Sequence, residues 1–151
     1  MSFNNGKTRN DILDAALGFF QGIAPWQSAP SRKFKTWDDV PHAARPAMFL
    51  VKTGEERTHN DFEGLPPSIT MDVTMFIYTW APQSVAVPDT QLQDILDSVD
   101  KALAPSPLMG SKQTLGGLVS HCWIEGRTLT IPGDLDGDGI AVIPLKILIP
   151  S

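Results

Sequence analysis

Apolar residues recur at every third or fourth position along two stretches of the chain, residues 9–22 and 90–103. This spacing places them on one side of an α-helix, so both stretches are predicted to be amphipathic helices. Thr8 and Asp11 suit the start of the first helix, because a hydroxyl and a carboxylate there accept from free backbone amides. Pro25 follows this helix and ends it.

Five other stretches have the patterns of β-strands. Apolar and polar residues alternate over residues 69–80, whose second face is polar at first and aromatic near its end. We therefore expect that second face to leave the core and meet another surface. Residues 47–53 are almost wholly apolar, which predicts a buried strand. Further strands are predicted over residues 115–125, 127–132 and 140–149.

The remaining segments are polar or rich in proline. Residues 54–66 carry charges and turn formers, which indicates a long exposed loop or the extended tip of a hairpin. Residues 25–45 are predicted to be irregular, with a short extended piece at 33–37 and a helical turn at 38–43. Residues 1–8 are expected to be a flexible tail.

The strands are grouped along the chain instead of alternating with helices. This order favours the α+β class, with a mainly antiparallel sheet and two helices packed on one face. Residues 9–151 are expected to form this single domain. Pro144 lies within the last strand and has no N–H to donate, which predicts that this strand lies at an edge or is bulged.

Composition and charge exclude several classes of protein. With 42% apolar residues in 151, the chain has enough apolar surface to fold. Its net charge of −5 disfavours a compact nucleic-acid binder, which is normally basic. A single cysteine excludes an internal disulfide and suits a reducing compartment. No targeting signal is visible, and no apolar run approaches the roughly 20 residues that cross a bilayer, so no membrane partner is expected.

The segment DLDGDG places three carboxylates at alternate positions, on Asp134, Asp136 and Asp138. Alternating carboxylates in a tight loop can converge on a hard cation such as calcium. A calcium loop also needs an acid at its twelfth position, which here is Leu145. Asp-Gly pairs are equally typical of hairpin turns. Two interpretations stay open, a divalent-cation site and a solvated acidic turn.

His121 and Cys122 are neighbours, but adjacent side chains on a strand point to opposite faces and cannot share a ligand. We expect Cys122 in the core, and His121 on the other face with Trp123 as an interface residue. The phosphate-loop, nucleophile-elbow and zinc-protease motifs are missing from the sequence. The residues therefore predict no catalytic group and no cofactor, and describe a domain with interaction surfaces.

Several segments in order resemble the tail-terminator family of long-tailed bacteriophages and prophages, which belongs to their tail-completion (minor tail) proteins. In the C-terminal half, a helix ends in a proline-rich loop and is followed by QTLGGLV, a His-Cys-x-Ile-x-Gly strand, an acidic hairpin and a closing strand broken by proline. In the N-terminal half, TWDDVPHAARPAMFLVKTGEE leads from a Trp-Asp-x-Val piece into an apolar strand and a charged loop. The resemblance spans about residues 9–150.

The resemblance implies a structural protein of the virion, assembled in the host cytoplasm, and not an enzyme. Such proteins form a homo-oligomeric ring, typically a hexamer, that caps the head-proximal end of the tail tube and stops its polymerisation. The implied partners are the tail tube protein and the head–tail connector or neck protein. DNA would pass through the lumen without specific binding, and the acidic balance is compatible with that passage.

Sheet edges, aromatic strand ends and the charged loop are the expected contact surfaces. For ring contacts the candidates are the strand of Pro144 and the aromatic end of residues 69–80, with His121 and Trp123 as further interface residues. Segment 54–66 is the candidate for reaching the tube, since docking function often lies on loops. Residues 111–117 are expected to become ordered on assembly. By residue, the strand-end and loop candidates are Phe76, Tyr78, Trp80, Glu55, Glu56, Arg57, Asp61 and Phe62.

Two alternatives remain at this level. One is another neck or head-completion ring protein of the same particle. The other is a calcium-stabilised binding module, which would depend on the three aspartates of DLDGDG.

Overall fold

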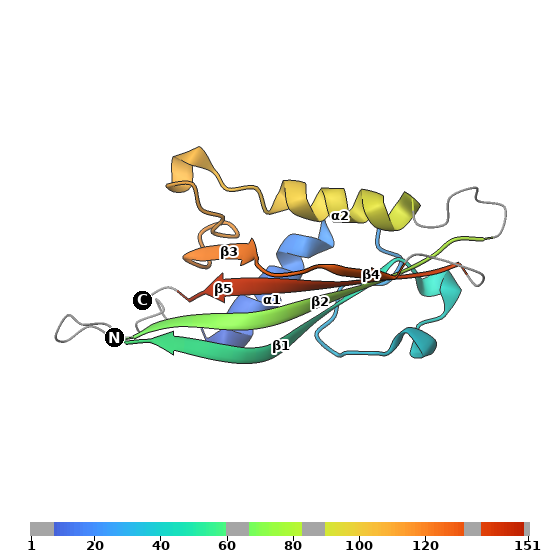
Figure 1. Cartoon of the computed structure of the whole chain (residues 1–151), viewed down its shortest axis with the longest axis horizontal. Helices are drawn as coiled ribbons and strands as arrows, with labels where there is room; N and C mark the ends of the chain where they lie inside the picture. The colour runs from blue at the N-terminus through green and yellow to red at the C-terminus, as the bar shows by residue number, and fades with distance from the viewer. Residues whose placement is uncertain (1–7, 60–66, 83–89, 132–136, 150–151) are drawn as a thin grey trace.

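The computed structural model describes residues 8–59, 67–82, 90–131 and 137–149 (Figure 1). Two helices and five strands make up the described chain. In order they are α1 (Arg9–Gln21), β1 (Ala47–Thr58), β2 (Ser68–Trp80), α2 (Thr90–Ala102), β3 (His121–Ile124), β4 (Leu129–Ile131) and β5 (Asp138–Leu148). Three short 3-10 turns join them: η1 (Trp37–Asp39), η2 (His42–Ala44) and η3 (Pro107–Met109).

The strands form one sheet in the order β1-β2-β5-β3, with β4 also paired to β5, and all these strand pairs are antiparallel. Both helices lie on the same face, where their buried residues join the inward residues of the strands in one core. The predicted α+β class, the mainly antiparallel sheet and the two helices on one face are confirmed.

Both helices form for the predicted reason. The Thr8 hydroxyl accepts from the Asp11 amide, and the Asp11 carboxylate accepts from the Thr8 amide, so a reciprocal capping box starts α1. Thr8 is the N-cap of α1, as its pairing with Asp11 in the sequence predicts, so the tail expected over residues 1–8 does not include it. Residues 1–7 lie outside the described residues. In α2 the predicted apolar stripe is buried, as Leu92, Ile95 and Val99 show.

The β1–β2 hairpin is longer than the apolar pattern predicts. β1 continues to Thr58 and pairs residue by residue with the start of β2, after a register shift between Lys52 and Gly54. Residues 54–58 are therefore strand, and the alternative of an extended hairpin is right for them. A prediction from apolar content does not reach residues 54–58, because they are polar. Backbone hydrogen bonds to β2 keep them in the strand. Residues 60–66 lie outside the described part.

The prediction that Pro144 marks an edge strand is wrong. β5 is central, with β2 on one side and β3 and β4 on the other. Pro144 falls in the gap between the residues of β5 that pair with β3 and those that pair with β4. Its carbonyl accepts from the Glu125 amide across this gap, 3.2 Å away. The missing N–H thus faces the break between two partner strands, where no ladder bond is lost.

The predicted strands at 115–125 and 127–132 are shorter in the structure, at β3 and β4. Backbone φ angles are positive at Gly110, Ser111, Leu115, Gly116 and Gly117, and an extended strand cannot pass through them. Leu115 of segment 111–117 is buried in the core of the domain. Ordering of this segment on assembly stays a prediction.

The described residues place no α-helix on the other face of the sheet, which is called here the helix-free face. The segment that contains η1 and η2 covers part of it, near the end of β1 and β2 (cyan, lower right in Figure 1). Val40 from this segment packs with Ala47, Phe49 and Tyr78 in a second, smaller core. The aromatic end of β2 does meet another surface, as predicted, and that surface belongs to the same chain.

Candidate interaction surface

Alternation along the strands brings most of the predicted contact residues to the helix-free face. Even-numbered residues of β2 and β5 are opposite each other in the register, and the odd-numbered ones are buried against the helices. Trp123 and His121 are opposite Lys146 and Leu148 of β5 and therefore share the helix-free face. The set brought together is Phe76, Tyr78, Trp80, His121, Trp123 and Pro144.

Tyr78 is not an exposed contact residue, contrary to the sequence-based expectation. Only 2% of it is accessible, and its hydroxyl donates to the carbonyl of Lys35 at 2.7 Å. Burial raises the pKa of this phenol. The segment that contains η1 and η2 covers Tyr78, so this side chain anchors that segment to the sheet.

Phe76 begins an uncovered apolar surface. It is half-buried and contacts Phe34, with ring centroids 4.8 Å apart. It is opposite Val142 of β5, which is opposite Leu129 of β4. Direct neighbours thus cross three strands, and Ile140 and Ile131 form the next cross-strand pair. We name this surface the apolar strip: Phe34, Phe76, Ile140, Val142, Leu129 and Ile131.

The apolar strip is exposed where a soluble chain normally presents polar residues. Phe34 is 44% accessible, Leu129 52% and Ile131 57%. The strand predicted at 127–132 carries no orientation in the sequence-based expectation, which therefore does not include Leu129 and Ile131 among the contact residues. The signal was the alternation of Leu129 and Ile131 in a short strand, which puts both on one face. Contiguous apolar surface of this kind marks an interaction site.

No protein-family model matches this chain, and no curated protein sequence matches it either.

His121 and Trp123 form a separate aromatic pair further along the helix-free face. Their rings stack with centroids 4.7 Å apart. His121 Nδ1 accepts from the Gln113 amide at 3.1 Å. Cys122 between them points into the core and is inaccessible, as predicted. Burial raises the pKa of its thiol to about 12, so it remains protonated and unreactive at neutral pH.

A polar pair separates the two apolar regions. Asp72 and Lys146 are opposite each other on β2 and β5 and are joined by a hydrogen-bonded ion pair. The hydrogen bond from Lys146 to Asp72 raises the pKa of the lysine. The helix-free face therefore runs from an apolar end near β4 to a mixed aromatic and charged end near β3.

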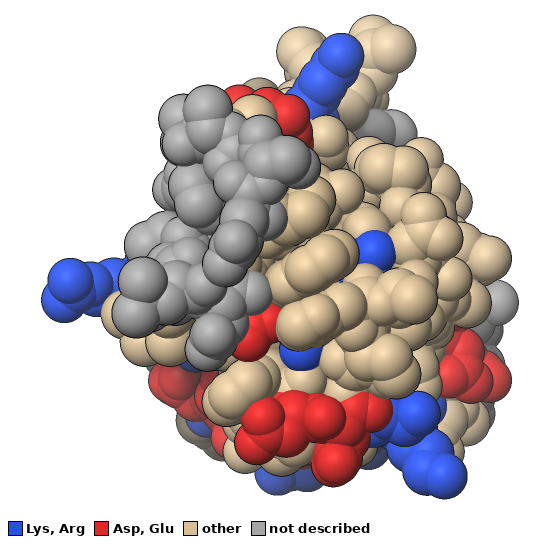
Figure 2. All heavy atoms as spheres, turned by 90° about the vertical axis from the view of Figure 1, so that its right-hand side faces the viewer, with Lys and Arg blue, Asp and Glu red and all other residues tan. Residues whose placement is uncertain are grey.

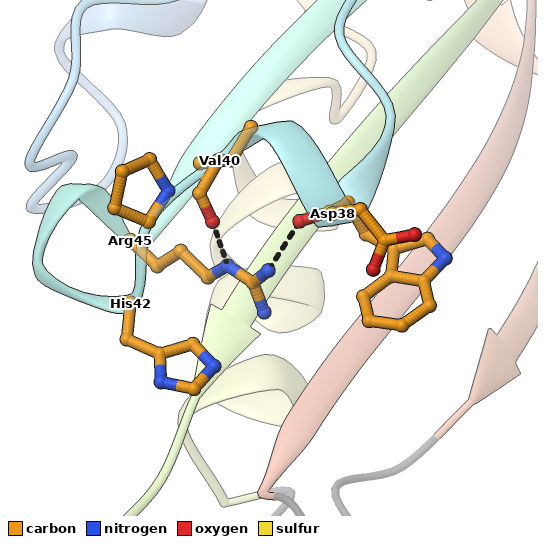
Figure 3. Close-up of a pocket in the computed structure, with 6 residues that line it drawn as sticks. Asp38, Val40, His42 and Arg45 are labelled. Atoms are coloured by element: carbon orange, nitrogen blue, oxygen red, sulfur yellow. Dashed lines mark hydrogen bonds between the residues drawn. The ribbon is translucent and has the colours of Figure 1, made fainter.

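Arg45, which the sequence analysis did not single out, fastens the η1–η2 segment to the sheet (Figure 3). Its side chain is 2% accessible. Its guanidinium donates to the carbonyls of Val40 (3.1 Å), Trp37 (2.6 Å) and Thr79 (3.2 Å) and to the Asp138 carboxylate (2.5 Å). A hollow of about 260 Å³ opens beside it, lined by Trp37, Asp38, Val40, Pro41, His42 and Arg45.

These contacts bear on the two interpretations of DLDGDG, a divalent-cation site and a solvated acidic turn. The Asp138 carboxylate accepts from Arg45 and lies 3.2 Å from Nε2 of His42, so its charge is already balanced within the chain. Asp134 and Asp136 lie outside the described residues. Across the described ranges, no three His, Cys, Asp or Glu side chains gather where they could hold a metal ion.

Trp80 ends β2 beside this arrangement. Its ring stacks on that of His42 with centroids 4.5 Å apart and an interplanar angle of 8°. Figure 2 views this end of the molecule, which is on the right in Figure 1. Much of this end is free of charged side chains, and acidic and basic groups gather along its lower border.

Three of the charged residues predicted to reach the tail tube, Glu55, Glu56 and Arg57, lie on β1. Glu55 is opposite Met71, on the helix side of the sheet, and forms ion pairs with Arg9 and Lys52. Hydrogen bonds from Arg9 and Lys52 lower the pKa of this carboxyl to about 2. Glu55 thus ties β1 to the start of α1 and is not free for a partner.

Glu56 and Arg57 are exposed on the same strand, and Asp61 and Phe62 lie outside the described residues. No helix in the described part of the chain is long and apolar enough to cross a membrane.

Proposed function

We propose that the chain is a structural phage protein that forms a ring on the head-proximal end of the tail tube. In this role it stops tube polymerisation and offers a surface for head or connector joining. The resemblance over residues 9–150 suggests the role, and one structural observation supports it. A small α+β domain has a contiguous apolar strip on its helix-free face that stays exposed among the residues that the structure describes.

The chemistry of this surface suits contact between proteins. Exposed Leu and Ile side chains gain by leaving water, and they offer neither a nucleophile nor a proton donor to a substrate. Four charged groups of the same face and its border are paired within the chain, Asp72 with Lys146 and Arg45 with Asp138. A surface of this kind favours assembly over catalysis.

Electron microscopy of particles from a phage or prophage that lacks this gene tests the proposal. Abnormally long tails without heads are expected, because tube growth would have no stop. Tails of normal length beside DNA-filled heads would replace the terminator with another neck or head-completion protein. Intact particles would overturn both structural roles.

A further inference from the structure

Leu108 is the most exposed of the large apolar residues that the structure leaves uncovered. It is 94% accessible and lies in η3, between exposed prolines and a glycine. We name Pro105, Pro107 and Leu108 the knob. The knob lies at the upper left in Figure 1 (orange), whereas β4 and the turns η1 and η2 lie towards the right (Figure 1).

The loop that carries the knob is held in place by its own hydrogen bonds. The Ser106 amide donates to the Lys112 carbonyl at 3.1 Å and closes the base of the loop. The Gln113 side-chain amide donates to the carbonyls of Ala102 (3.0 Å) and Ala104 (3.1 Å), where α2 ends. A leucine displayed on a fixed turn loses little conformational freedom when it binds.

The apolar strip is equally fixed, because five of its six residues belong to paired strands. Its outer strand, β4, also has a free edge. Leu129 and Ile131 pair with Val142 and Ile140 of β5, whose amides and carbonyls point towards β4. Backbone groups alternate in direction along a strand, so the amide and carbonyl of Thr130 point away from β5. On β3 the equivalent outward amide, that of Cys122, donates to Gln113. No described residue forms a hydrogen bond with the outward amide or carbonyl of Thr130 on β4.

We propose that the knob of one copy docks on the apolar strip of a second copy. The two surfaces are both uncharged, and they lie at opposite ends of the molecule, so they cannot meet within one chain. A contact between two different surfaces of identical chains is head-to-tail, and it repeats until it closes into a ring or extends as a filament. Closure into a ring rests on the proposed function, whereas the head-to-tail contact does not.

Sedimentation of the purified full-length chain tests the contact. The wild type is expected to form oligomers of its 16.4 kDa subunit. Leu108→Asp alters only the knob, and Leu129→Asp only the strip. Each is expected to weaken self-association by about tenfold or more, as loss of an anchor residue at an interface does. Phe34→Ser, outside the sheet, is a second strip variant. Gln21→Glu adds the same charge at an exposed position on neither surface and should change nothing.

Mixing the two variants distinguishes a head-to-tail contact from a symmetric one. Leu108→Asp retains an intact strip and Leu129→Asp an intact knob, so an equimolar mixture should form a heterodimer and stop there. In a matched experiment, Leu108→Cys and Leu129→Cys chains should form a mixed disulfide under mild oxidation. Cys122 is buried and does not compete.

A monomeric wild type would overturn the contact. So would loss of association in the strip variants but not in Leu108→Asp. A mixture of the two variants that remains monomeric, while circular dichroism shows both to be folded, would also overturn it. These measurements use the isolated chain, so they can contradict the contact while the deletion experiment supports the proposed function. If the chain forms rings but its deletion leaves tails normal, the contact stands and the proposed function is wrong.

Discussion

Arg45 shows how much a single buried side chain can organise. Its guanidinium satisfies three backbone carbonyls and one carboxylate from segments that are far apart in sequence. A buried guanidinium is tolerated only when nearly all its donors are bonded, and its removal takes a charged donor away from each of these acceptors. The cover over Tyr78 therefore depends on Arg45.

Replacement of Arg45 by alanine is expected to lower the free energy of unfolding by about 3–5 kcal/mol, because Asp138 and the three carbonyls would lose a buried charged donor and Asp138 would retain only His42 beside it. Arg32→Ala is the matched control, since Arg32 pairs with Asp14 at the exposed surface. Arg32→Ala should change the free energy of unfolding by less than about 1 kcal/mol. Urea unfolding of both variants measures the difference, and equal losses would contradict the structural role of Arg45.

Glu55 predicts a specific dependence of stability on pH. Arg9 and Lys52 lower its pKa to about 2 in the folded chain, so folding favours the ionised carboxylate. Its contribution is complete above the ordinary pKa of a glutamate, near 4.5, and is lost as pH falls towards about 2.

Glu55→Gln should therefore be less stable than the wild type at neutral pH, by about 1 kcal/mol at the level of exposed ion pairs. The difference should shrink between about pH 4.5 and 2. Glu56→Gln, at the next and exposed position, is the control. Thermal unfolding at several pH values gives both curves, and a constant difference for Glu55→Gln would refute the ion-pair cluster.

At the level of elements, the start of α1 and the placement of β5 are decided by different forces. The capping box of Thr8 and Asp11 is local, so the sequence predicts it. The position of β5 is not local. A proline usually marks an edge strand, but Pro144 lies opposite a break between β3 and β4. The residues next to Pro144 in the sequence do not indicate that break.

Thr8→Ala should destabilise the protein by about 1 kcal/mol, because the Asp11 amide at the start of α1 loses its side-chain acceptor. Thr8→Ser retains the hydroxyl and should behave nearly as the wild type. Denaturant unfolding of the two variants checks this. A similar loss in both would place the effect outside the capping bond.

For the whole molecule, the distribution of charge decides how copies can meet. The chain carries a net charge of −5, so identical copies repel each other at long range. The apolar strip and the knob are uncharged surfaces on that background. Association through them depends on removal of apolar area from water, which salt does not screen.

Self-association should therefore be unchanged or strengthened when ionic strength rises from about 0.05 to 0.5 M, because salt screens only the repulsion. Sedimentation at the two salt concentrations measures the effect, with Gln21→Glu as a reference for added charge. Dissociation in high salt would show that ion pairs hold the copies together instead.

Both helices, the cap of α1, the alternation that places Cys122 in the core and the α+β class could all be predicted from the sequence, because each depends on the spacing of neighbouring residues. Which residues are covered depends on tertiary contacts. Tyr78 and Phe76 have the same pattern on one strand, yet the η1–η2 segment buries the first and leaves the second half-exposed. The extension of β1, the role of Arg45 and the apolar strip likewise arise from contacts between segments distant in the chain, and local periodicity does not encode those contacts.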